Sequence, residues 1–364
     1  MQVTVRKTTD EEHAVKRPYL TSSMVEAVNT CPRWGLVHNV HGRQFSIGHR
    51  QMALEAGSLM HEVFSCLNLL QVGVFQRLPN HMHNKGRELF GVSRWKHMFA
   101  AMSPNDEPLS ENMTRRFEKF IYACIATSEF HDDPNDKNRT VTNLEICSLE
   151  LLQYWMMNFA RFNIYIEDRD RSDCVIGIEQ SLDVVFEVID DDNDVTMSQR
   201  FIGLADAVYQ GEEGNVVLGE YKTTSSMNEG WREAFKTRHQ ITAYQAMLQA
   251  YFDKVELKTI ILGSAIPVRS TAMPVQHFPI ERDQGNILEF LETVKFTGQI
   301  IKDNYLDPLH APMFTHSCNR YFRPCSMMDL CTAEKSDQYI MYDQMYTEEK
   351  NLSPSEMKAL LRRD

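Results

Sequence analysis

Short apolar runs and alternating apolar and polar positions dominate the second half of the chain, and this pattern predicts β-strands. Residues 174–189 alternate well enough for a strand, and Phe201 to Tyr209 and Val216 to Tyr221 are apolar enough for buried strands. Thr259 to Val268 fits another buried strand, and Ala272–Ile280 fits a shorter one. The sheet of the protein should therefore come from this half of the chain.

Helical periodicity is strongest in four other segments. Thr21 to Val40 begins with Ser23-Met24-Val25-Glu26, a capping-box pattern that starts helices. Residues 51–72, Arg232 to Phe252 and 285–305 also repeat their apolar positions with the period of a helix. Residues 1–18, in contrast, show no periodicity, so we expect an extended arm there.

The region between residues 75 and 170 carries no catalytic signature and predicts a helical insertion. Three helices fit, at about Lys85–Met102, Glu111–Phe130 and Val141–Phe162. Methionine and aromatic residues are frequent in this region. Most should pack between helices, and a minority could stack on the bases of single-stranded nucleic acid.

The two strands around residues 200–222 bring together three charged side chains. Gly211-Glu212-Glu213-Gly214-Asn215 has the composition of a turn, and a hairpin folded about Glu213 places Asp206 opposite Glu220. Lys222 follows Glu220 by two residues, so the period of a strand returns it to the same face. Two carboxylates and one ammonium group are therefore expected at one place.

These three residue types are suited to metal-dependent hydrolysis of a phosphodiester. Two carboxylates can hold Mg²⁺ or Mn²⁺, and the cation acidifies a bound water and neutralises charge on the phosphate. A lysine beside them can orient that water or stabilise the phosphate oxygens. An ordinary salt bridge on a surface hairpin is the alternative reading. The apolar surroundings favour a functional site, because unpaired charge is costly there.

Gln240 and Tyr244 complete a motif with these three residues. They are four apart in a predicted helix and project from one face, which alone would indicate only a half-buried helix face. The order Asp206, Glu220-x-Lys222, Gln240-x-x-x-Tyr244 resembles the PD-(D/E)XK nuclease superfamily, specifically its RecB-like branch.

The resemblance covers residues 20–62 and 174–335 and implies both a fold and further roles. The chain departs from the superfamily's pattern at Ala205, which stands where the P of PD-(D/E)XK denotes a proline. The implied fold is α/β, a restriction-endonuclease-like core of mixed β-sheet flanked by helices. Gln240 and Tyr244 resemble the pair that contacts the DNA backbone. Gly57-x-x-x-His61 also resembles this branch, in which the histidine is a metal ligand.

Composition limits the class of protein and the mode of DNA binding. The chain has 364 residues, 43% of them hydrophobic, and a formal net charge of −12. No apolar run approaches the length of a membrane span and no signal-peptide pattern is present at residues 1–13, so a cytoplasmic location is the default expectation. The acidic balance argues against indiscriminate binding to duplex DNA. It still allows a local basic groove.

Three of the eight cysteines cluster near the end of the chain and predict a metal site. Cys318, Cys325 and Cys331 lie within fourteen residues, and Cys31 is the natural fourth ligand. Thiolate chemistry alone leaves zinc and iron–sulfur equally open.

The RecB-like resemblance favours a structural [4Fe–4S] cluster that joins the two ends of the domain. The six residues between Cys318 and Cys325 depart from the two that are usual in this branch, which makes His316 an alternative to Cys318. The remaining cysteines, in apolar or helical surroundings, should be small buried hydrophobic residues.

The sequence therefore predicts a single nuclease domain: N-terminal helices in residues 1–74, the insertion in 75–170, the nuclease core and cysteine cluster in 171–335, and a polar tail in 336–364. The leading function is a Mg²⁺- or Mn²⁺-dependent exonuclease acting on single-stranded DNA ends. A nucleic-acid-binding or assembly protein with vestigial cleavage is the alternative. A hydrolase of another phosphodiester is a third possibility. The sequence carries no signal of oligomeric state.

Overall fold

The computed structural model describes residues 2–9, 12, 19–44, 175–189, 195–210, 214–224, 227–265, 275–320 and 323–347, with single positions between 57 and 93. The expected insertion at 75–170 lies outside the described residues, apart from a few helical positions between 84 and 93. Residues 348–364 of the expected polar tail also lie outside them. In the helix expected at 51–72, Gly57, His61, Phe64 and the other described positions are helical.

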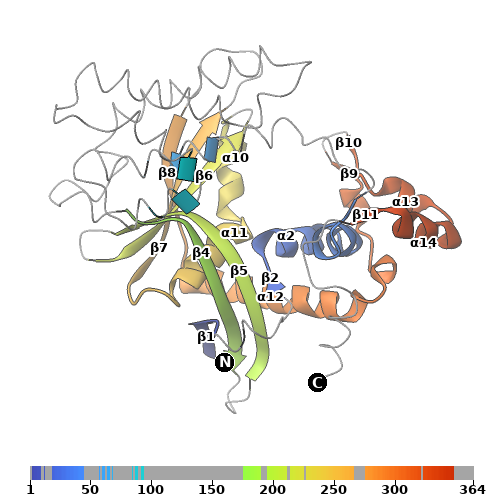
Figure 1. Ribbon diagram of the computed structural model, residues 1–364, viewed down its shortest axis with the longest axis horizontal. Coiled ribbons are helices and arrows are strands. Elements are labelled where there is room, and N and C mark those ends of the chain that lie inside the picture. The colour runs from blue at the N-terminus through green and yellow to red at the C-terminus, as the bar shows by residue number, and fades with distance from the viewer. Residues whose placement is uncertain are drawn as a thin grey trace.

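A mixed, open β-sheet forms the centre of the fold (Figure 1). Its strand order is β1 (Gln2–Lys7), β4 (Val175–Ile189), β5 (Val195–Gln210), β6 (Val216–Thr224), β7 (Val255–Ala265) and β8 (Val275–Glu281). The β6–β7 pair is parallel, and its neighbours in this order are antiparallel. A parallel pair needs a crossover connection, which here contains α10 (Glu229–Glu233) and α11 (His239–Leu248).

Helices α2 (Ser22–Thr30), α11 and α12 (Gln284–Asn304) flank the sheet and form the main core with it. Phe186 of β4, Phe201 of β5 and Phe290 of α12 make edge-to-face contacts with ring centroids 5.5 to 6.0 Å apart. The class of fold is therefore the mixed α/β sheet with flanking helices that the sequence predicts.

Three local predictions are wrong. The arm expected at residues 1–18 contains β1, whose six residues pair antiparallel with β4 in the sheet. Helix α2 is capped by Thr21, whose side chain accepts a hydrogen bond from the Met24 amide, so it starts before Ser23. The helix expected at Arg232 to Phe252 is broken after Lys236, because the Arg238 backbone is extended (φ −71°, ψ 122°).

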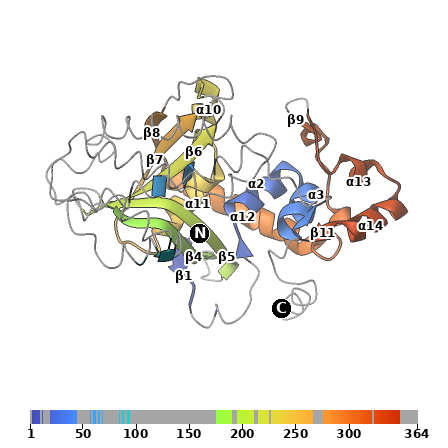
Figure 2. The same ribbon diagram turned by 45° about the horizontal axis from the view of Figure 1, so that its top comes forward.

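The segments after α12 return to the N-terminal helices. Helices α13 (Met328–Thr332) and α14 (Lys335–Gln344) lie beside α3 (Pro32–Trp34) and the π-helix Gly35–Val40 (Figures 1 and 2). Val37 packs with Leu309, Leu330 and Met345 in a second small core. Strand β11 (Tyr346–Thr347) pairs with β3 (Arg43–Gln44). None of the described helices is both long and apolar enough to cross a bilayer.

Candidate functional site

The β5–β6 hairpin has the register expected from its turn. Ala207 pairs with Gly219, and each of the next three pairs continues this register toward the turn. The ladder stops there, one step before Asp206 and Glu220. The Asp206 carboxylate instead crosses the gap, and its Oδ2 accepts a hydrogen bond from the Tyr221 amide at 2.7 Å. Asp206 is therefore held by the neighbouring strand at the point where the two strands separate.

His61, Glu179 and Asp206 form a group suited to binding a cation. One ligand atom from each lies within 4.8 Å of the other two. His61 Nδ1 is 3.4 Å from Asp206 Oδ1. Burial lowers the pKa of His61, but its contact with Asp206 outweighs this effect and the pKa is raised overall. A cation in this group would replace the imidazole proton.

Glu179 is the member of this group that the predicted site leaves out, because a single carboxylate in a strand is weak evidence from the sequence alone. Ile178 pairs with Ala207 and Gln180 pairs with Ala205, so Glu179 lies level with Asp206 on the neighbouring strand. Its backbone is left-handed (φ 46°), and Ser65 Oγ donates to its Oε1 at 3.1 Å. The turn alone does not reveal this relationship. The pair nearest the turn, Ile189 with Val195, extrapolates to Ile178 opposite Asp206, and the register shift between Val188 and Ile189 brings Glu179 there instead.

Glu220 and Lys222 lie beside this group as a buried pair. Glu220 is completely buried, and its Oε1 accepts a hydrogen bond from Lys222 Nζ. Its Oε2 has no hydrogen-bond partner among the described residues. Burial raises the pKa of Glu220 to about 7, although the charge of Lys222 opposes the shift. Burial lowers the pKa of Lys222, but the charges of Glu220 and Asp206 raise it overall.

The donor set fits a hard divalent cation. Carboxylate oxygens are the preferred ligands of Mg²⁺ and Mn²⁺, and an imidazole is also compatible with Mn²⁺. An unpartnered buried carboxylate oxygen is costly, and a cation bound near Glu220 Oε2 would remove that cost. Glu220 does not belong to the group of three ligand atoms within 4.8 Å, although its pKa responds to the charges of Asp206 and His61.

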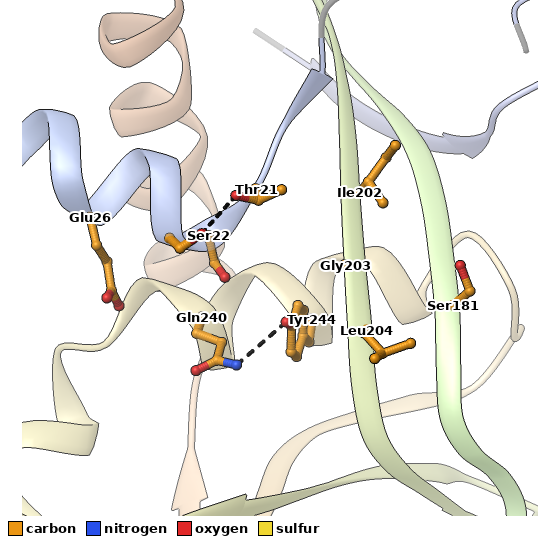
Figure 3. Close-up of a pocket in the computed structure, with 10 residues that line it drawn as sticks. Thr21, Ser22, Glu26, Ser181, Ile202, Gly203, Leu204, Gln240 and Tyr244 are labelled. Atoms are coloured by element: carbon orange, nitrogen blue, oxygen red, sulfur yellow. Dashed lines mark hydrogen bonds between the residues drawn. The ribbon is translucent and has the colours of Figure 1, made fainter. Parts of the chain in front are cut away.

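Gln240 and Tyr244 line a cavity of about 490 Å³ next to this site (Figure 3). Gln240 Nε2 donates to the Tyr244 hydroxyl at 3.4 Å. Burial and the charge of Glu220 raise the pKa of Tyr244, so its hydroxyl keeps its proton. The ring lies against Gly203 of β5, where an added Cβ would be 2.5 Å from Tyr244 Cε1. The two motif residues therefore share one face, as expected.

The four cysteines gather where the ends of the described chain meet. All four are free thiols, so no disulfide joins these ends. Burial raises the pKa of both Cys325 and Cys331, and nearby Cys31 adds to each shift. The Cys325 amide donates to the Cys318 carbonyl at 2.8 Å. His316, the alternative ligand, is exposed and its ring stacks on Phe314.

The spacing of the sulfurs bears on the choice of metal. No three of the four sulfurs lie within 4.8 Å of one another, although all four cysteines belong to the described part of the chain. Tetrahedral zinc with bonds of about 2.3 Å brings its sulfurs to about 3.8 Å from each other. The spacing is thus wider than a zinc site needs, and the cluster itself is not shown.

No protein-family model matches the chain, and no curated protein sequence matches it. The solved structures that are similar to this chain include the following two. The first, from Eubacterium rectale and described as "Putative exonuclease", is 13% identical, with a TM-score of 0.37, over 90% of this chain and 99% of that one. The second, described as SSO0001, is 18% identical, with a TM-score of 0.27, over 60% of this chain and 80% of that one.

Proposed function

We propose that this chain is a Mg²⁺- or Mn²⁺-dependent deoxyribonuclease with a restriction-endonuclease-like core. The observation that carries the proposal is the convergence of His61, Glu179 and Asp206 beside the buried Glu220–Lys222 pair. A structural role does not account for this arrangement, because it buries a carboxylate oxygen without a partner and holds the pKa of Glu220 near 7.

In this proposal His61, Glu179, Asp206 and Glu220 would hold the cation, which would supply acidification of a water molecule and neutralisation of charge on the phosphate. Lys222 keeps its proton, since its pKa is raised, and its ammonium group can orient the attacking water or stabilise the phosphate oxygens.

Gln240 and Tyr244 position the DNA strand beside these groups. Both are neutral hydrogen-bonding side chains on the first turns of α11, and they line the cavity that borders β5. We assign the enzyme to single-stranded DNA ends as an exonuclease, in line with the RecB-like motif. The net charge of −12 supports this assignment, because it disfavours broad binding to duplex DNA.

The cysteines have a structural role in the same proposal. Cys31, Cys318, Cys325 and Cys331 would hold a [4Fe–4S] cluster, with zinc as the alternative, and join α2 to the segment around α13. Thiolate–metal bonds contribute folding energy directly. The chain would then be one nuclease domain, in which residues 75–170 are an insertion.

A second candidate is a nucleic-acid-binding or assembly protein whose cleavage is vestigial. The net charge of −12 favours the assembly form of this candidate, because nucleic-acid-binding proteins typically carry a basic patch. The intact Glu220 and Lys222 count against it.

A cleavage assay separates the two functions. Labelled single- and double-stranded DNA should be incubated with the full chain and Mg²⁺ or Mn²⁺, with and without EDTA. We expect EDTA-sensitive cleavage of the single strand, lost in Glu220→Gln and retained in Glu281→Gln, an exposed glutamate at the end of β8. Cleavage that persists in Glu220→Gln, or in EDTA, would reject the assignment.

A further inference from the structure

We propose that the cavity between α2, β5 and α11 binds one unpaired nucleobase, that of a nucleotide next to the scissile phosphate. The inference rests on the proposed nuclease function and deepens it, because it identifies the groups that select single-stranded DNA. The cavity of about 490 Å³ is within the size range of pockets that hold small molecules.

The cavity begins two residues along β4 and β5 from the cation group. Leu204 pairs with Ser181 across β5 and β4, and both line the cavity. Each is two residues from a member of the acidic pair, Asp206 or Glu179. Residues two apart in a strand lie on the same face, about 7 Å from each other. A chain held at the cation group therefore reaches the cavity within roughly one nucleotide.

A gap in the sheet opens the cavity. Strand β2 (Tyr19–Leu20) pairs with β5 at residues 200–201, and β6 pairs with it at residues 207–210. Between them, residues 202–206 have β4 on one side and no described strand on the other. The start of α2 and the face of α11 that carries Gln240 border this gap (Figure 3). No described strand fills the gap, and in this proposal the base occupies it.

The lining suits a base better than a phosphate. Leu204 is 47% exposed, an unusual position for a leucine inside a concave polar surface, and Ile202 lies two residues before it. These side chains offer an apolar contact to the flat face of a base. Ser23, Gln240 and the Glu26 carboxylate offer hydrogen bonds to its edge. None of the described lining residues carries a positive charge, and Glu26 repels a phosphate.

Glu26 also predicts a base preference. A carboxylate accepts hydrogen bonds from exocyclic amino groups, as on cytosine N4, whereas thymine offers an oxygen at the corresponding position. The edge of the base that reaches these groups is occupied by pairing in a duplex. The cavity should therefore require an unpaired base and prefer cytosine to thymine.

Abasic scanning tests the proposal. Single-stranded oligonucleotides that carry one abasic residue at successive positions should be digested with the full chain and Mn²⁺. We expect cleavage to slow about tenfold when the abasic residue occupies one position beside the bond to be cut, since burial of one leucine-sized apolar surface corresponds to about this factor. Cytosine at that position should be cleaved faster than thymine.

Two variants assign the effect to the cavity. Leu204→Ala should slow cleavage of intact DNA about tenfold while leaving the abasic substrate nearly unchanged. Glu26→Gln should remove the preference for cytosine. Leu288→Ala, which replaces a leucine of α12 that is 42% exposed, is the matched control and should cleave both substrates as the wild type does.

The outcomes separate this inference from the proposed function. Efficient cleavage with no sensitive abasic position, or an equal loss on both substrates in Leu204→Ala, would overturn the base subsite and leave the nuclease intact. Absence of any metal-dependent cleavage by the wild type would reject the nuclease assignment, and the subsite would fall with it.

Discussion

Glu179 and Asp206 lie level with each other on neighbouring antiparallel strands, and their carboxylates converge with His61 on one point. The left-handed backbone at Glu179 and the hydrogen bond from Ser65 hold its carboxylate there. A non-glycine residue with this conformation inside a strand is uncommon and costs free energy. This conformation supports the metal site proposed above, since strained residues cluster at such sites.

Glu179→Gln should weaken binding of Mn²⁺ at least about tenfold, because the amide retains the shape of the side chain but removes its charge. Isothermal titration calorimetry on metal-free protein measures this directly. Glu187→Gln, on the same strand and in contact with Arg6, is the matched control and should bind as the wild type does. Equal affinity in the two variants would show that Glu179 is not a ligand.

The sequence predicted the parts of this site that depend on strand periodicity. The register of the β5–β6 hairpin follows from its turn, so the relation of Asp206 to Glu220 could be worked out in advance. Glu179 could not be placed by the same reasoning, because a register shift between Val188 and Ile189 moves the β4–β5 pairing by one residue. Its left-handed backbone and its hydrogen bond from Ser65, a residue 114 positions away, could not be foreseen either.

Strand pairs between distant parts of the chain could not be predicted from the sequence. Strand β1 pairs with β4, more than 170 residues away in the sequence, and nothing in the local pattern of six residues indicates that partner. The sequence did not predict the break between α10 and α11, because the helical periodicity continues through Arg238. The backbone of Arg238 is extended, and α11 begins at the next residue. The unpaired edge of β5 at residues 202–206 also depends on the fold. It lies between the segments that pair with β2 and with β6, and no local pattern in the sequence indicates where those two strands pair.

Glu220→Gln should abolish cleavage without lowering the thermal stability of the metal-free protein. Burial raises the pKa of Glu220 to about 7, so the ionised carboxylate destabilises the folded state near neutral pH, and the amide removes this cost. The ammonium group of Lys222 is not left without a counter-charge in this variant, because the carboxylate of Asp206 is also near it. The melting temperature in EDTA should be equal to or above that of the wild type, as measured by calorimetry.

Lys222→Ala provides the opposite case. It leaves the buried Glu220 carboxylate without its cation, and we expect a loss of about 3 kcal/mol in the free energy of unfolding, together with loss of cleavage. Chemical denaturation at pH 8, where Glu220 is ionised in the wild type, gives the measurement. If Glu220→Gln proved the more destabilising of the two changes, the pair would be a stabilising salt bridge rather than a functional site.

Gly203→Ala should reduce both stability and activity. The added methyl group would lie 2.5 Å from Tyr244 Cε1 and 3.3 Å from Met247 Sδ, so the tyrosine has to move. Overpacking of this kind costs about 1 to 3 kcal/mol, and displacement of Tyr244 should slow cleavage at least tenfold, as measured on labelled single-stranded DNA.

Gly230→Ala is the matched control for this change. Its Cβ meets only the Asn228 side chain, at an ordinary 3.5 Å, on the exposed helix α10. It should leave activity unchanged and raise stability slightly. Normal activity in Gly203→Ala would mean that the position of Tyr244 does not matter for cleavage.

His41 should make stability depend on pH. Burial lowers its pKa to about 4; the Tyr305 backbone opposes this shift and the charge of Arg43 contributes to it. The Tyr342 hydroxyl also contacts its Nδ1 at 2.8 Å. Between pH 6.5 and pH 4 the imidazole of His41 is protonated in the unfolded chain but neutral in the folded protein. The contribution of His41 to the free energy of unfolding is therefore complete above pH 6.5, and up to about 3 kcal/mol is lost as the pH falls to 4.

The His41→Phe variant keeps an aromatic ring against Tyr305 but has no proton to bind. The free energy of unfolding, measured by urea denaturation at pH 7 and pH 5, should decrease less in this variant than in the wild type. Identical decreases in both proteins would show that His41 does not contribute to the pH dependence.

Cys31→Ala should remove bound metal and loosen the junction between the two ends of the described chain. Cys31 is buried at the boundary of α2 and α3, and its thiol raises the pKa of both Cys325 and Cys331, which places it close to the two. If the four thiolates hold a [4Fe–4S] cluster, anaerobically purified wild type is brown and contains iron. The variant should be colourless, less soluble and lower in melting temperature, because metal–thiolate bonds contribute folding energy.

The control is Cys66→Ala, which changes a cysteine that stands alone in the sequence and should keep the brown colour of the wild type. Zinc in place of iron would support the site but change its metal, whereas a stable wild-type protein without either metal would refute it.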